Sequence, residues 1–114
     1  MRPAWRVSLL TMHTPFGWLK IDQESARRIQ DRLASYESMR WKEIMFSYRS
    51  HLIKRTDLCP EAQAHLEAIE QDDVDSVMSL GITQTERVFG ILEHNVLKVL
   101  WWDPEHEVCP SRLD

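Results

Sequence analysis

Hydrophobic and polar positions alternate most regularly in the last third of the chain. The alternation runs from Thr83 to Leu92 and predicts a strand with two distinct faces. The polar triplet Glu93-His94-Asn95 follows, and Val96–Trp102 is a second run rich in β-branched and apolar residues. Because asparagine tolerates the left-handed conformation of tight turns, this pattern predicts a β-hairpin whose pairing ends before Pro104.

The middle of the chain has helical spacing instead. Asp22 is a favourable N-cap residue, and apolar residues then recur every three or four positions as far as Tyr36. Ser38 is the expected cap of a second helix, and Pro60 suits the first turn of a third, because a first-turn residue needs no hydrogen-bonded N–H. Trp5–Met12 alternates like a strand, so the chain is expected to begin with one.

The order of these elements predicts the fold class. Val77–Ile82 adds a weaker strand, interrupted by Gly81, before the hairpin. Helices that are segregated in sequence from a C-terminal strand meander are typical of the α+β class. We expect an antiparallel sheet of three or four strands packed against two or three helices. A chain of 114 residues without a long linker is expected to form a single domain, residues 1–114.

Composition and charge narrow the function only slightly. No apolar run approaches the roughly 20 residues that a membrane-spanning helix needs. We therefore expect a cytoplasmic protein with no membrane partner. Two cysteines favour reduced thiols over a disulfide framework. Residues 1–60 carry 11 Lys/Arg against 6 Asp/Glu, whereas residues 61–114 carry 3 against 12. Such a basic half is compatible with nucleic-acid binding, and equally with ordinary solvated helix faces.

The polar end of the hairpin is the first candidate for chemistry. Asp103 and His106 could contribute to a metal site, but a single short cluster is weak support, and no metal or other cofactor is expected. Asp103 capping a turn before Pro104 is the simpler interpretation. Arg87 lies within an otherwise apolar strand, where an arginine needs an anionic partner. Arg87 and His106 are therefore the candidate catalytic pair, as phosphate-binding cation and general acid or base.

Two further groups are candidates for binding RNA or a protein partner. Ser50–Asp57 is polar, has no clear periodicity, and holds His51, Lys54 and Arg55 within five positions. Trp101 and Trp102 could stack on a base, and because neighbouring strand residues face opposite ways, one of them is expected to be exposed.

The ending Trp101-x-Asp103-Pro104-x-His106 resembles that of an uncharacterised group of small bacterial and phage-associated proteins. More distantly, the predicted β-α-α-β-β-β layout is similar to the RelE-like ribonuclease toxins of toxin–antitoxin pairs. That resemblance implies a metal-independent ribonuclease that acts on RNA or the ribosome and is neutralised by a protein antitoxin, with Arg87 and His106 as the positional matches. The alternative is a non-enzymatic protein-interaction module, such as a phage-associated regulator or inhibitor, that uses the Trp-Trp-Asp-Pro segment as a binding edge.

Overall fold

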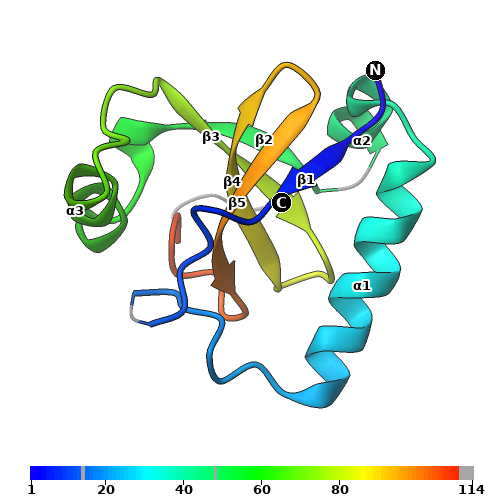
Figure 1. Cartoon of the computed structure of the whole chain (residues 1–114), viewed down its shortest axis with the longest axis horizontal. Coiled ribbons are helices and arrows are strands. Elements are labelled where there is room, and N and C mark those ends of the chain that lie inside the picture. The colour runs from blue at the N-terminus through cyan, green and yellow to red at the C-terminus, as the bar shows by residue number, and fades with distance from the viewer. Residues whose placement is uncertain (14, 48, 111–114) are drawn as a thin grey trace.

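In the part of the chain that the structure describes, helices lie mainly in the first two thirds and three consecutive strands follow them (Figure 1). The computed structural model describes residues 1–13, 15–47 and 49–110. In chain order the elements are β1 (Ala4–Arg6), α1 (Gln23–Glu37), α2 (Trp41–Ser47), β2 (His51–Lys54), the 3-10 turn η1 (Arg55–Asp57), α3 (Pro60–Ala68), β3 (Ser76–Gly81), β4 (Arg87–Glu93) and β5 (Val96–Asp103). The α+β class is therefore confirmed.

The sheet is larger than predicted and is mixed rather than antiparallel. Its strand order is β1-β5-β4-β3-β2. All neighbours are antiparallel except β1, which pairs parallel to β5 with Ala4 opposite Val96. The extra strand, β2, lies where the sequence showed no periodicity, because at an edge only Ile53 of its four side chains is fully buried. The prediction of three or four antiparallel strands was thus wrong in strand number and in the orientation of β1.

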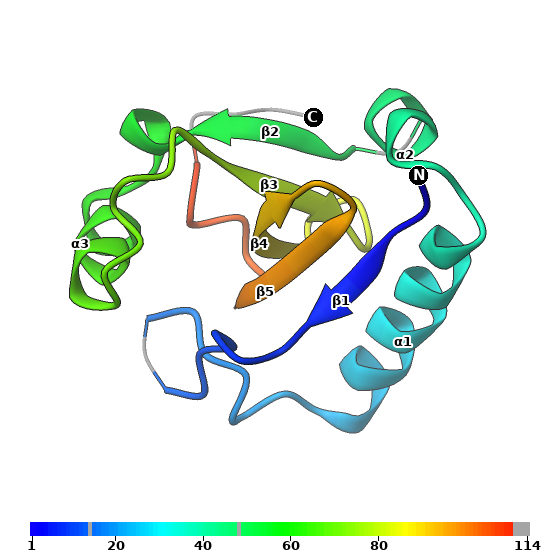
Figure 2. The same cartoon turned by 45° about the horizontal axis from the view of Figure 1, so that its top comes forward.

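Both faces of the sheet are covered (Figure 2). On one face, α1 and α2 contribute buried side chains such as Ile29, Tyr36 and Ile44 to one apolar cluster. On the other face, α3 contributes Ala62 and Leu66 to a second cluster. Neither face of the central strands is therefore exposed to solvent, and the first five residues of β4 are all buried. None of the helices in the described residues is long and apolar enough to cross a membrane.

The predicted hairpin is confirmed. β4 and β5 pair antiparallel with Glu93 opposite Val96, which leaves His94 and Asn95 as the loop. His94 takes the left-handed conformation, with φ 56°. The register shifts between Phe89, which faces Trp101, and Gly90, which faces Val99, so Leu100 is the extra residue of a bulge in β5.

The helix boundaries match the cap residues in two cases out of three. Asp22 caps α1, since its side chain accepts the Ser25 N–H at 2.7 Å, and α3 begins at Pro60. Ser38 is a correction: it ends α1 rather than starting α2, and its hydroxyl donates to the Ser35 carbonyl at 2.8 Å. A serine hydroxyl can serve either helix end, so the residue type alone did not distinguish them.

Candidate functional site

Arg87 is a buried residue that binds the backbone of the turn before it. It begins β4 and is 1% exposed. Its Nη1 donates to the carbonyls of Thr83 and Glu86 at 2.7 and 2.9 Å, and its Nη2 donates to the carbonyl of Gln84 at 3.0 Å. The guanidinium therefore holds the β3–β4 turn closed. A phosphate could reach it only if that turn opened.

Asp103 ends β5 directly opposite Arg87 and is also 1% exposed. Its two carboxylate oxygens accept the backbone N–H groups of Glu107 and Val108, each at 2.9 Å. Burial raises the pKa of the Asp103 carboxyl above its usual 3.8, although the two hydrogen bonds and the nearby positive charges oppose this. Asp103 is the cap of the turn that follows β5.

His106 lies in that capped turn, half-buried and left-handed at φ 59°. The charges of His106 and Arg87 both favour ionisation of Asp103. The structure thus gathers the candidate catalytic pair around one buried carboxylate. Arg87 is buried by the turn that it binds. This geometry is therefore suited to holding two turns together rather than to receiving a substrate.

The two adjacent tryptophans are both buried, which corrects the expectation that one of them is exposed. Trp101 is 0% exposed and Trp102 is 6% exposed. The Trp101 indole donates to Nδ1 of His65 at 2.9 Å, on the α3 side, while Trp102 packs against Trp18 on the α1 side. The expectation failed because it assumed that one face of the sheet is exposed to solvent, whereas helices and loops cover both faces of this sheet.

The basic group His51, Lys54 and Arg55 lies on β2 and at the start of η1. β3 lies between β2 and β4 in the sheet. Because neighbouring strands are about 4.8 Å apart, β2 and its basic group lie about 10 Å from β4, the strand that carries Arg87. Lys54 is exposed, His51 is half-buried, and Arg55 donates through Nε to the Val74 carbonyl at 3.2 Å.

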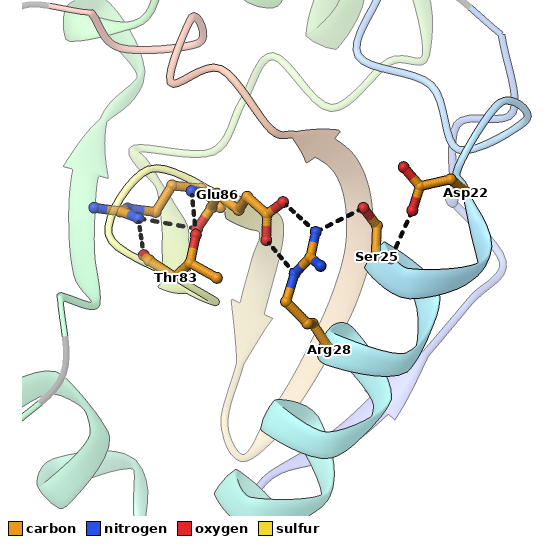
Figure 3. Close-up of polar contacts among 6 residues, drawn as sticks. Asp22, Ser25, Arg28, Thr83 and Glu86 are labelled. Carbon is orange, nitrogen blue, oxygen red and sulfur yellow. Dashed lines mark hydrogen bonds and ion pairs between the residues drawn. The ribbon is translucent and has the colours of Figure 1, made fainter.

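A polar network that the sequence did not reveal joins α1 to the β3–β4 turn (Figure 3). Arg28 binds the Glu86 carboxylate with two nitrogens, at 2.8 and 3.1 Å, and donates to the Ser25 hydroxyl at 2.9 Å. The Glu86 N–H in turn donates to the Thr83 hydroxyl at 3.1 Å. A hollow of about 500 Å³ beside it is lined by Arg28, Asp31, Arg32, Ile82, Thr83 and Gln84. Together with Arg87, the network fixes the turn from two sides.

The β2 edge is the accessible candidate site. Among the described residues, β2 has a strand neighbour on one side only. The Arg55 N–H donates to the Asp75 carbonyl at 2.9 Å. Two residues earlier in the strand, the main-chain N–H and C=O of Ile53 are therefore also directed toward β3. Because antiparallel hydrogen bonds alternate, the N–H and C=O groups of Leu52 and Lys54 are directed toward the open side.

The side chains near this edge are apolar and basic. Leu52 is 49% exposed, and Phe46, at the end of the preceding helix, is 94% exposed. Residues 40–55 contain five Lys/Arg (Arg40, Lys42, Arg49, Lys54 and Arg55) against one acidic residue, Glu43. Exposed large apolar side chains beside an edge strand are typical of a protein-binding surface. Residues 51–54 show no alternation, so nothing in the sequence indicates this strand beyond the adjacent apolar residues Leu52 and Ile53.

No protein-family model, curated protein or solved structure matches the chain. Within the described residues, no three histidine, cysteine, aspartate or glutamate side chains are grouped so that they could hold a metal ion. The inference of function therefore depends on the geometry of the chain itself.

Proposed function

We propose that the protein is a non-enzymatic interaction module that binds an extended, acidic segment of another protein by adding it to the sheet next to β2. The observation that carries the proposal is the open side of β2, with the half-exposed Leu52 at its centre. It keeps the predicted class of interaction module but moves the binding edge away from Trp101 and Trp102, which are buried.

An extended occupant fits because the edge presents main-chain groups in a row. Leu52 and Lys54 each direct an N–H and a C=O outward, which is the template that strand addition uses. Main-chain hydrogen bonds then supply affinity, and alternate side chains supply specificity. Leu52 faces the same side of the sheet as its partner Met78, so an apolar residue of the added strand would pack beside it.

An acidic occupant fits because β2 itself carries an exposed lysine and no acidic residue. Lys42 and Lys54 are both exposed, on α2 and β2 respectively. Charge complementarity raises the association rate and disfavours basic partners. A second copy of this chain matches less well, since two copies of the basic edge would face each other.

The ribonuclease toxin stays a prediction. It requires a cation that can reach a phosphorane, and Arg87 is engaged with three carbonyls at 1% exposure. Growth arrest with RNA degradation on expression of the wild type, abolished by His106→Ala with the fold intact, would support the toxin and contradict the interaction module.

The test uses the main chain of Lys54. Its φ is −60°, which proline adopts without strain, and its N–H faces away from β3. Lys54→Pro therefore removes one outward donor while leaving the sheet intact. Lys54→Gln is the matched control, because it removes the same charge and keeps the N–H.

Binding is measured by fluorescence anisotropy with a labelled peptide in which glutamate and valine alternate. Lys54→Gln should weaken binding by up to about fivefold, the range of one exposed ion pair. Lys54→Pro should weaken it a further tenfold or so, for one lost main-chain hydrogen bond. Leu52→Ala should also weaken binding, whereas Leu19→Ala, at a similar 55% exposure, should not.

Three outcomes would contradict the proposal. The first is equal affinity of Lys54→Pro and Lys54→Gln. The second is tighter binding of a short single-stranded RNA to the same surface, which would favour a nucleic-acid partner. The third is a β2-mediated dimer of this chain that does not bind the peptide.

A further inference from the structure

The two cysteines of the chain lie on segments that contact each other in the fold, although they are 50 positions apart in the sequence. The backbone N–H of Cys59, at the start of α3, donates to the carbonyl of Val108 at 2.7 Å. Cys109 follows Val108 directly, and its thiol donates to the Asp57 carbonyl at 3.3 Å. Both cysteines belong to the apolar cluster under α3 and are thiols in the structure.

The hydrogen bond from Cys59 to Val108 holds the main chain of Cys59 beside the residue that precedes Cys109. A disulfide needs a Cα separation of about 4.4–6.8 Å, which is the separation that the proposal requires of Cys59 and Cys109. The Cys109 sulfur already lies against the Asp57-Leu58-Cys59 segment. Cys59 is partly exposed whereas Cys109 is 3% exposed, so a reagent from solution meets Cys59 first.

We propose that Cys59 and Cys109 are a modification site at which small disulfides such as oxidised glutathione form an intramolecular disulfide. The Cys59 thiolate attacks one sulfur of oxidised glutathione and releases one glutathione thiolate. The Cys109 thiol loses its proton to water, and the resulting thiolate attacks the Cys59 sulfur of the mixed disulfide and releases the second glutathione thiolate. Two protein thiols are oxidised and one glutathione disulfide is reduced to two thiols.

The disulfide would fasten the segment after β5 to the start of α3. In the reduced protein that segment is held by the Asp103 cap and by the Cys59–Val108 hydrogen bond. Closing a loop of about 50 residues restricts the unfolded chain strongly, because the loop-closure entropy grows with loop length. The oxidised protein is therefore expected to be more stable than the reduced one.

The test equilibrates the purified protein with oxidised or reduced glutathione, blocks remaining thiols with N-ethylmaleimide, and measures the intact mass and the Tm. The oxidised wild type should be a monomer that has lost two hydrogen atoms and takes up no maleimide. Its Tm should rise on the order of 10 °C above that of the reduced form. Cys59→Ser should have the same Tm under both conditions, which shows that the shift needs the disulfide.

Other products would overturn the proposal. They are a glutathione adduct that persists on Cys59, a disulfide-linked dimer, or an internal disulfide that leaves the Tm unchanged. A final control repeats the equilibration in concentrated urea. The internal disulfide should form less readily there, and an equal yield would mean that the fold does not bring the two thiols together.

Discussion

Replacing Arg87 by methionine tests whether this arginine is a structural clamp. Methionine has a similar length and keeps the apolar part of the side chain, but it has no donors. The carbonyls of Thr83, Gln84 and Glu86 would each lose a charge-assisted hydrogen bond, and the Asp103 carboxylate would lose a neighbouring positive charge.

The cost follows from these lost partners. The Glu86 carbonyl would keep the Ile82 N–H as a donor, so the carbonyls of Thr83 and Gln84 are the two that lose their partner. A polar group that is buried without a partner costs about 1–3 kcal/mol, which sets an upper range of about 2–6 kcal/mol. Two effects reduce it: the guanidinium is no longer desolvated, and water can reach the carbonyls, since Gln84 is exposed. We expect a loss of about 2–4 kcal/mol in the free energy of unfolding, which is a large part of the stability of a domain of this size.

Urea unfolding followed by tryptophan fluorescence measures this loss, since the chain has five tryptophans. The matched control is Arg27→Met, which removes an exposed arginine of α1 and should change the free energy of unfolding by less than about 0.5 kcal/mol. If Arg87→Met cost less than about 1 kcal/mol, or no more than the control, the clamp would be refuted and Arg87 would again be available for a functional role.

Three further predictions concern other buried positions. Gly90→Ala should cost about 2–3 kcal/mol in urea unfolding, because a Cβ would lie 2.6 Å from the Lys98 carbonyl oxygen and 2.8 Å from Leu97 Cγ; a neutral substitution would contradict this. Burial lowers the pKa of His65 below its usual 6.5, so its contribution to stability is present above pH 6.5 and is lost as the pH falls through the folded-state pKa. His65→Gln should lack that loss, and identical pH profiles would argue against it. Burial raises the pKa of Asp103 above 3.8, so its folded form holds the proton more tightly than the unfolded form. Its contribution falls as the pH rises from 3.8 through the folded-state pKa, and the stability difference between wild type and Asp103→Asn should change in that direction, a flat difference being the contrary result.

Local signals in the sequence predicted the local parts of the fold. The hairpin around His94, the cap at Asp22 and the helix start at Pro60 each depend on a few neighbouring residues, and the structure has all three. β2 escaped prediction because a short edge strand buries one side chain, Ile53, and its exposed residues look like those of a loop.

The candidate site was harder to predict because it depends on topology. Whether Trp101 and Trp102 are buried depends on which helices cover each face of the sheet, and no local pattern states this. Arg87 donates to three backbone carbonyls, and such acceptors have no signature in the sequence. Leu52 became a candidate only when the strand order placed it on an open edge.

Amide hydrogen exchange at β2 tests strand addition most directly. In the unbound protein, the N–H groups of Leu52 and Lys54 face outward and should exchange quickly, while that of Ile53 is bonded to β3 and should exchange slowly. With the peptide of alternating glutamate and valine at saturation, Leu52 and Lys54 should become protected and Ile53 should change little. Unchanged exchange at Leu52 and Lys54 in a saturated complex would contradict the account.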